Sequence, residues 1–203
     1  MNEKVLNQTE KKSDSEDYLK AERRNVTRNE FNNGQVLAKS SSNRWHNLIA
    51  TNTTIAIGSR LHNHKCEIYT GNMRVQLNRN RFCYPDLTIV NGEPNFTDSN
   101  FDVLLNPSIT VEIFSNTVNS FDKMEKLESF LAMDSIRECL LVKEDEMRVE
   151  HYARQNAKQW IYKIYNERDD VVALESINCK VSLAEIYTHI KFKQTEMSSK
   201  AVN

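Results

Sequence analysis

Two carboxylates interrupt apolar, strand-like segments of the chain. Asp86 lies in the segment 82–90, FCYPDLTIV, and Glu112 lies in the segment 109–114, ITVEIF. A carboxylate among β-branched and aromatic residues is costly to bury unless a cation meets it. If the two segments are neighbouring strands, both acids can converge on one hard divalent cation such as Mg²⁺, which prefers oxygen ligands. Strand acids are also commonly exposed or paired with a lysine, so the spacing leaves both interpretations open.

A magnesium site of this kind favours one class of reaction. Mg²⁺ keeps several of its waters, uses only one or two protein carboxylates, and most often acts on phosphate substrates. It polarises a phosphoryl oxygen and lowers the pKa of a bound water. The segment after Glu112 adds a positively charged side chain, Lys126. It stands four residues after Asp122, so the two share a helical face. That pair is either a surface ion pair or the source of an ammonium for the scissile phosphate, and the chemistry indicated is phosphodiester hydrolysis.

The elements that must position these residues follow from periodicity and turn signals. Asn33-Gly34 between the strand-like segments 26–31 and 35–38 predicts a hairpin with a type I′ turn. Apolar residues at helical spacing predict a helix from about 43 to 61, capped by Ser41 or Ser42. A polar loop is expected at about 91–107. The remaining strands are expected at 66–69, 73–77, 138–142, 147–152, 160–165 and 171–174, and the remaining helices at 15–22 with Ser15 as cap, at about 120–133 and at 182–187.

This order of elements predicts one α/β (α+β) domain around a mixed sheet. Residues 1–14 and 191–203 are polar, so we expect a disordered N-terminal tail and a polar C-terminal tail around a single domain at 15–190. The formal net charge of -1 gives no global field that would point to nucleic acid or membrane. Locally, residues 44–81 hold six basic residues and one acid, which is compatible with a phosphate-facing surface or with ordinary solvated side chains.

Cysteine usage and hydropathy indicate the cellular compartment. The four cysteines form no C-x-x-C pair and are typical of reduced core residues. No stretch approaches membrane-spanning length, and the first residues lack an apolar signal segment. We therefore expect a cytoplasmic protein without a membrane partner.

The order and spacing of several short motifs carry a family resemblance. They are YPDLTIV at 84–90, VEIFS at 111–115, Asp122-x-x-x-Lys126-x-x-x-Phe130 and ECLLV at 138–142, with EFNNG at 30–34, His46-x-x-Ile49-x-x-Asn52 and VEHY at 149–152. Together they resemble the Uma-type restriction endonucleases of bacteria, in the PD-(D/E)XK nuclease superfamily. The resemblance covers roughly residues 15–190. It implies a restriction-endonuclease-like mixed sheet flanked by helices, with an extra N-terminal hairpin and extra C-terminal strands.

The resemblance also implies an activity and its metal ligands. It points to a Mg²⁺-dependent DNA endonuclease, with Mn²⁺ as a substitute ion. Asp86 corresponds to the PD aspartate and Glu112 to the (D/E) residue, so both would be metal ligands and catalytic residues. The backbone carbonyl of Ile113 would be a third ligand. Ser115 would form hydrogen bonds with the metal-ligand residues without binding the metal itself.

The superfamily's lysine raises a separate question. It should stand two positions after Glu112, where this chain has Phe114. The resemblance implies that the Uma-type family carries this lysine on the next helix instead. Lys126 is then the residue expected to stabilise the attacking hydroxide or the negative charge that develops on the phosphate. Lys123 is the alternative. Glu30 matches an acid on the first hairpin that would complete a second metal position or orient water.

Several basic residues are candidates for contacts with nucleic acid. Arg74, Arg79 and Arg81 lead into the segment of Asp86, and they are candidates for contacts with backbone phosphates. Lys123 could serve in the same way. His46 could contact a phosphate, although a histidine on a largely apolar helix face is more often structural.

The expected partner is double-stranded DNA, and we expect a homodimer because cutting both strands of a duplex calls for two sites. Two alternatives stay open. One is a catalytically inactive protein that keeps the fold to bind nucleic acid or a protein partner. The other is a nuclease that acts on RNA or on structured DNA.

Overall fold

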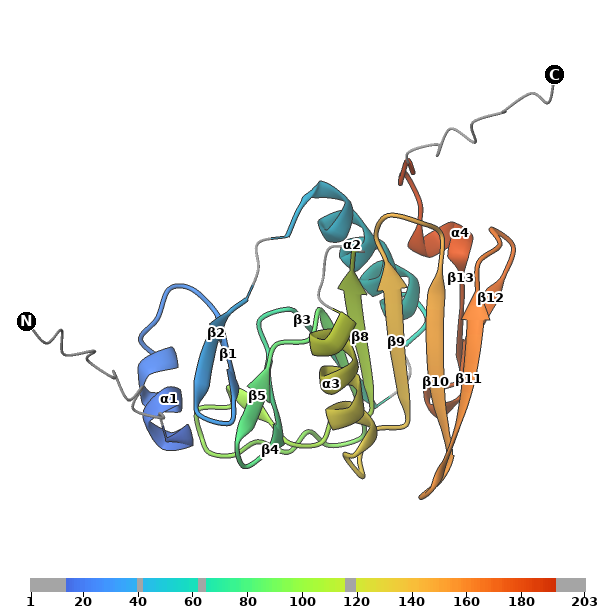
Figure 1. The fold of residues 1–203 in the computed structure, drawn as a ribbon. Helices are drawn as coiled ribbons and strands as arrows, with labels where there is room; N and C mark the ends of the chain where they lie inside the picture. Colours follow the sequence, from blue (N-terminus) through green and yellow to red (C-terminus); the bar gives the residue numbers. More distant parts are fainter. Residues whose placement is uncertain (1–13, 40–41, 62–64, 116–119, 193–203) are drawn as a thin grey trace, which may run out of the picture.

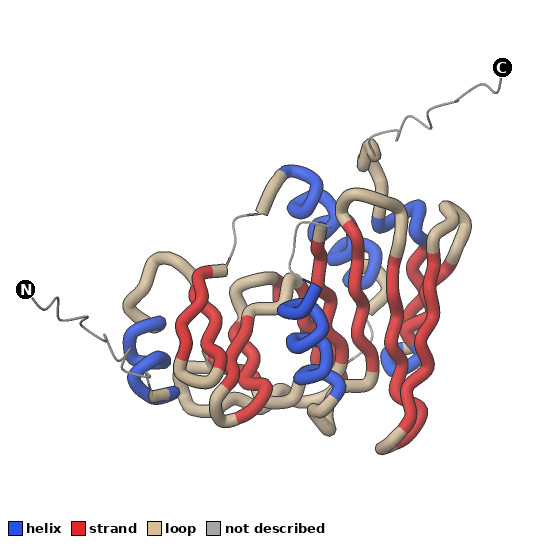
Figure 2. Tube along the Cα trace, viewed as in Figure 1, coloured by secondary structure: helices blue, strands red, loops and turns tan. Residues whose placement is uncertain are grey.

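The computed structural model describes residues 14–39, 42–61, 65–115 and 120–192, without the side chains of residues 120–122. The chain forms a mixed α/β fold whose strands divide over sheets of five, six and two strands (Figures 1 and 2). The predicted tails lie almost wholly outside the described residues. None of the helices described is both long and apolar enough to span a membrane.

The six-stranded sheet carries the segment of Glu112. Its order is β11 (Gln159–Tyr165), β10 (Val149–Asn156), β9 (Glu138–Lys143), β8 (Ile109–Phe114), β6 (Leu87–Asn91) and β3 (Cys66–Thr70). All neighbours are antiparallel except β8 and β9, which are parallel. Parallel neighbours need a crossover, and α3 (Ser120–Leu131) lies within that connection. The crossover therefore brings α3 next to the strand that carries Glu112.

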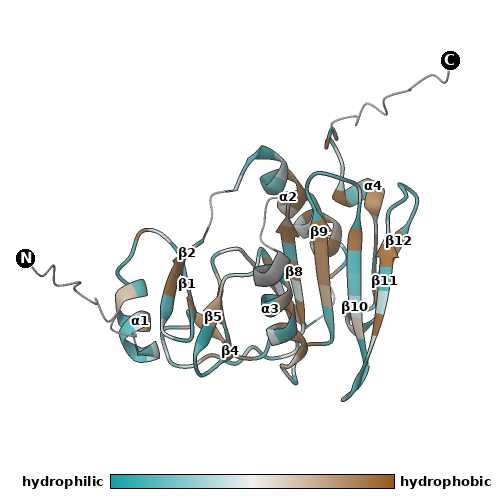
Figure 3. Ribbon diagram, in the orientation of Figure 1, coloured by the Kyte–Doolittle hydropathy of each residue, from teal (hydrophilic) through white to brown (hydrophobic). Residues whose placement is uncertain are grey.

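Two helices cover opposite faces of this sheet. Figure 1 shows α3 in front of β8 and β9, and α2 (Arg44–Gly58) behind them. Because side chains alternate along a strand, Val111 and Ile113 pack with the α2 core. Phe114 packs with Leu127 and other residues of α3. Hydrophobic colour along β9 in Figure 3 marks the sheet that these layers bury.

The five-stranded sheet holds the hairpin and stands beside the first sheet. Its order is β2 (Gln35–Ala38), β1 (Asn29–Asn32), β5 (Arg81–Cys83), β4 (Arg74–Asn78) and β7 (Val103–Leu104). Asn33 and Gly34 have φ angles of 50° and 92°, which confirms the predicted turn with two positive φ values. The N-terminal helix α1 (Ser15–Glu22) stacks Tyr18 on Phe31 of β1.

The C-terminal part adds a pair of strands and a short helix. Strands β12 (Val171–Leu174) and β13 (Cys179–Ser182) pair antiparallel, with a 3₁₀ turn (Glu175–Ile177) between them. Helix α4 (Leu183–Ile186) follows and contacts α2. The strand β13 has no counterpart among the predicted strands. All four cysteines are free.

The structure corrects the expectation of one strand through 82–90 and one mixed sheet. The segment is two strands, β5 and β6, which belong to different sheets. Pro85 stands between them, and proline has no amide hydrogen for a sheet ladder. Asp86 therefore lies at the junction of the two sheets rather than inside a strand. The predicted strands at 66–69 and 73–77 are likewise split between the two sheets, as β3 and β4.

Smaller corrections concern the helix caps and one loop. The N-caps are Asp14 for α1 and Asn43 for α2, whose side-chain oxygens accept backbone amides in place of Ser15 and Ser42. Ser41 lies outside the described residues. The loop expected at 91–107 contains the short strand β7.

Candidate active site

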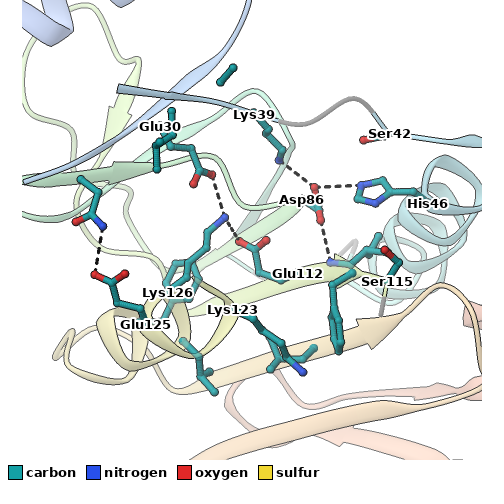
Figure 4. A pocket seen from close by; sticks show the side chains of 18 of the residues that line it. Glu30, Lys39, Ser42, His46, Asp86, Glu112, Ser115, Lys123, Glu125 and Lys126 are labelled. Atoms are coloured by element: carbon teal, nitrogen blue, oxygen red, sulfur yellow. Dashed lines mark hydrogen bonds and ion pairs between the residues drawn. The ribbon is translucent and has the colours of Figure 1, made fainter. Parts of the chain in front are cut away.

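A single pocket brings the predicted acids and lysine together. It has a cavity volume of about 670 Å³ and is bounded by the β1–β2 hairpin, the start of α2, α3 and the ends of β8 and β9. Figure 4 shows Glu30, Lys126 and Glu112 pointing toward one another, and it shows Lys39 and His46 pointing toward Asp86. The charged residues that line it are Glu30, Lys39, His46, Arg81, Asp86, Glu112, Lys123, Glu125, Lys126 and Glu144.

Asp86 is held from three sides at the junction of the two sheets. Its Oδ2 accepts the backbone amide of Ile113 at 2.8 Å, because β6 and β8 are antiparallel neighbours. Its Oδ1 lies 2.9 Å from Lys39 Nζ and 3.2 Å from His46 Nε2. The carboxylate is buried, and its neighbours therefore replace the water that burial removes.

Glu112 meets a lysine from the crossover helix. Lys126 Nζ lies 2.9 Å from Glu112 Oε1 and 2.9 Å from Glu30 Oε1. Glu30 also accepts the backbone amide of Tyr84 at 3.1 Å, which fixes the β1 carboxylate against the chain that leads to Asp86. One ammonium thus joins acids from β1 and β8.

The pKa values of these groups are shifted in opposite directions. Burial raises the pKa of Glu112 to about 7, with Asp86 adding repulsion and Lys126 opposing the rise. Burial also acts to raise the pKa of Asp86, but the His46 hydrogen bond and the Lys39 charge hold it well below its usual range. The carboxylates of Glu112 and Glu30 raise the pKa of Lys126 well above its usual range despite burial. Two nearby carboxylates with separated pKa values are typical of functional sites.

The oxygen donors at this point suit a hard divalent cation. The described part of the chain holds no group of three or more His, Cys, Asp or Glu side chains that could bind a metal ion, so a donor set within it includes fewer such side chains. Two carboxylates and a backbone carbonyl suit Mg²⁺, which retains several waters. The amide of Ile113 faces Asp86, and the carbonyl of a strand residue points to the same side as its amide. Asp86, Glu112 and the Ile113 carbonyl therefore fit as the donor set.

The second predicted lysine has a different environment. Lys123 Nζ lies 3.6 Å from the ring centroid of Phe114 and 3.5 Å from a carboxylate oxygen of Glu150. Burial lowers its pKa, with Glu150 opposing. Lys123 lines the pocket, but its described ion pair is with Glu150 rather than with Glu112 or Asp86. Ser115 lines the same pocket. The predicted pairing of Asp122 with Lys126 involves a side chain outside the described residues.

The three arginines proposed as phosphate contacts are separated by the fold. Arg74 is only 5% exposed and donates to the hydroxyl of Tyr84, so this placement corrects the expectation that it faces a phosphate. Arg79 is exposed in the turn between β4 and β5. Arg81 lines the pocket and lies 3.0 Å from a carboxylate oxygen of Glu125.

Two charged residues of the pocket, Lys39 and Glu144, are not predicted by the sequence patterns. Lys39 follows β2 and reaches Asp86, and Glu144 follows β9 and accepts the side-chain amide of Asn43 at 2.9 Å. His46 Nδ1 lies 3.8 Å from Glu144. Neither residue belongs to a motif, and only the meeting of hairpin, helix and sheet brings Lys39 to Asp86 and Glu144 to His46. The one available signal is that Lys39 closes the hairpin that already carries Glu30.

Comparisons with known proteins agree with this fold. A crystal structure described as "a putative nuclease belonging to DUF820", from Anabaena variabilis, has a TM-score of 0.71 and 17% sequence identity, and the match covers 86% of this chain and 97% of that one. This likeness shows the shared fold.

Two Synechocystis proteins, both described as uncharacterized, also match. One is 27% identical over 71% of this chain and 82% of its own length. The other is 22% identical over 87% of this chain and 92% of its own length. The model of the Uma2 family, described as "Putative restriction endonuclease", matches residues 15–184. This match spans most of the chain, and the protein therefore belongs to the Uma2 family.

Proposed function

We propose that this protein is an endonuclease that hydrolyses phosphodiester bonds of DNA with the help of Mg²⁺, for which Mn²⁺ can substitute. One observation carries the proposal. Asp86, which immediately precedes β6, and Glu112, on the neighbouring strand β8, share a pocket with Lys126, whose ammonium lies 2.9 Å from Glu112. The motifs imply two acids and one lysine for the hydrolysis of a phosphodiester, and this pocket contains such a set.

Different residues of the pocket would bind the cation and stabilise the developing charge. Asp86, Glu112 and the Ile113 carbonyl would hold the divalent cation. When bound, the cation supplies charge to the phosphoryl oxygens and lowers the pKa of a water. Lys126 would place its ammonium beside the attacking water and the phosphate, where it stabilises the negative charge that develops. Glu30 orients Lys126 by accepting from the same ammonium.

DNA is the proposed substrate because the family description names restriction endonucleases. A homodimer is part of the proposal for the same reason, since cleavage of both strands needs two such pockets. Arg81, Lys123 and His46 line the pocket and would contact backbone phosphates near the cleaved bond.

The proposal is tested by incubating the purified protein with supercoiled plasmid, linear duplex DNA, single-stranded DNA and RNA. Each substrate is tested with Mg²⁺, with Mn²⁺ and with a chelator. We expect cation-dependent nicking and linearisation of the plasmid, with weaker action on RNA. Cleavage confined to RNA or single strands would change the substrate class, and no cleavage of any nucleic acid would refute the proposed activity.

A further inference from the structure

The ammonium of Lys39 forms an ion pair with the carboxylate of Asp86 inside the pocket. Its Nζ lies 2.9 Å from Asp86 Oδ1 and also donates to the carbonyl of Tyr84. The backbone at Lys39 is anchored, because its amide donates to the carbonyl of Arg28 at 2.9 Å. Its side chain is 14% exposed and lines the pocket that holds Glu112 and Lys126. The ammonium therefore stands in the pocket beside a proposed metal ligand.

The partners of Asp86 leave little room for a cation. A carboxylate oxygen has two lone pairs. Oδ1 already faces Lys39 Nζ and His46 Nε2, and Oδ2 accepts the Ile113 amide. A divalent cation on Asp86 would lie close to the Lys39 ammonium, and like charges at such a distance repel strongly. Lys39 and the cation therefore compete for the same carboxylate.

Of the two groups on Oδ1, Lys39 is the one that can leave. His46 belongs to the first turn of α2, and its second ring nitrogen faces Glu144 at 3.8 Å. A lysine side chain has a flexible four-carbon stem and can move its ammonium by rotation alone. A released Lys39 would stay in the pocket, because its backbone is fixed by the hairpin.

We propose that Lys39 is a second lysine of the active site, which neutralises Asp86 until a divalent cation displaces it and then contacts the bound phosphodiester. This inference rests on the proposed function. The charges support it: Glu30, Asp86 and Glu112 face the ammoniums of Lys39 and Lys126. With all three carboxylates ionised, they exceed the two ammoniums by one negative charge, and a divalent cation turns this into one positive charge, which suits a singly charged phosphodiester.

The first test titrates the DNA-free protein with Mn²⁺ by calorimetry. We expect Lys39→Met to bind Mn²⁺ about tenfold more tightly than wild type, because a repelling charge has been removed. Lys39→Arg keeps the charge and should bind as wild type does. Lys180→Met, at an exposed lysine on β13, is the matched control and should change nothing. In the plasmid assay, Lys39→Met should cut about 100-fold more slowly despite its tighter cation binding.

Tighter binding with slower cleavage is a combination that a merely structural lysine would not produce. If Lys39→Met binds Mn²⁺ no more tightly than wild type, Lys39 does not compete for Asp86 and the inference is wrong. Wild type that binds Mn²⁺ and cuts DNA, beside a Lys39→Met variant unchanged in both, would overturn the role of Lys39 alone. Failure of the wild type to bind Mn²⁺ would overturn the proposed function as well.

A second test uses the wild-type protein and does not depend on the folding of any variant. The rate at which an amine-acetylating reagent modifies Lys39 is followed by mass spectrometry, with and without saturating Mn²⁺. Release from Asp86 should raise the rate at Lys39 several-fold, while the rate at Lys180 stays constant. An unchanged rate at Lys39 in protein that has bound Mn²⁺ would contradict its displacement.

Discussion

Lys126 Nζ lies 2.9 Å from Glu112 Oε1, and the two residues come from the helix and the strand of one crossover. Phe114, the residue two positions after Glu112, packs in the core beside Leu127 instead of offering a charge to the pocket. The crossover thus places a lysine beside Glu112 although the strand itself carries none. The same ammonium meets Glu30 from the hairpin, so three elements depend on one positive charge.

Replacement of this lysine should affect both stability and activity. Lys126→Met would leave the carboxylates of Glu30 and Glu112 close together without their shared cation. We expect the free energy of unfolding at about pH 8 to fall by about 3 kcal/mol, as is typical when one partner of a buried ion pair is removed. Plasmid cleavage should fall at least about 100-fold. Chemical denaturation and the plasmid assay measure the two effects.

A double variant separates stability from chemistry in this prediction. Lys126→Met leaves two carboxylates without a cation, and Glu112→Gln removes one of them. In the double variant, part of the lost stability should therefore return while cleavage stays absent. Lys180→Met is the control for loss of a lysine charge. Cleavage by Lys126→Met at the wild-type rate would show that Lys126 is not the lysine of the reaction.

The raised pKa of Glu112 predicts how stability depends on pH. Burial raises this pKa from 4.5 to about 7. A carboxyl with a raised pKa in the folded state favours folding at low pH, and this contribution is lost as pH rises through the folded pKa. Between about pH 5.5 and about pH 8, the free energy of unfolding of wild type should fall by about 2 kcal/mol more than that of Glu112→Gln. Equal pH dependence of the two proteins in chemical denaturation would refute the shift.

A second buried acid lies outside the pocket, and its contribution to stability should depend on pH in the opposite sense. Glu138, only 2% exposed, accepts the backbone amides of Glu175 and Ser176 at 3.1 and 3.2 Å, and its Oε1 lies 3.2 Å from His151 Nε2. It therefore ties β9 to the 3₁₀ turn after β12. Burial acts to raise its pKa, but these hydrogen bonds lower it, so its contribution to stability is lost as pH falls through its folded pKa.

Glu138→Gln is therefore expected to reduce the free energy of unfolding by about 2 kcal/mol, since charged hydrogen bonds are weakened. The rate of plasmid cleavage at a temperature where the variant is folded should equal that of wild type. Thermal unfolding and the plasmid assay together check this. A loss of cleavage in the fully folded variant would show that this network supports the active site.

Local patterns predicted much of the fold because the deciding interactions were local. The type I′ signal of Asn33-Gly34 depends only on backbone conformation, and the strand at 109–114 depends on alternation and β-branched residues. The turn and the strand at 109–114 are observed where they were predicted, but the first strand of the hairpin is Asn29–Asn32 rather than 26–31. The pairing of the segments that carry Asp86 and Glu112 was also predicted, and β6 does pair with β8.

The rest depended on interactions between distant elements. Pro85 lies in an apolar segment, and no local pattern says that the chain leaves one sheet there and enters another. Lys39 reaches Asp86 only because the hairpin lies against the sheet junction. The caps Asp14 and Asn43 compete with nearby serines of similar capping strength, and propensity alone does not separate them. The burial of Arg74 depends on Tyr84, which contacts it from the neighbouring strand segment.

The most direct test of the proposed active site compares wild type with Asp86→Asn in the supercoiled plasmid assay with Mn²⁺. The substitution keeps the size of the side chain and an oxygen for the Ile113 amide, but it removes the charge that would hold the cation. If Asp86 holds the cation, the wild type should convert the plasmid to nicked and linear forms, and folded Asp86→Asn should leave it supercoiled. Equal cleavage by both proteins would contradict the assignment of this pocket as the active site.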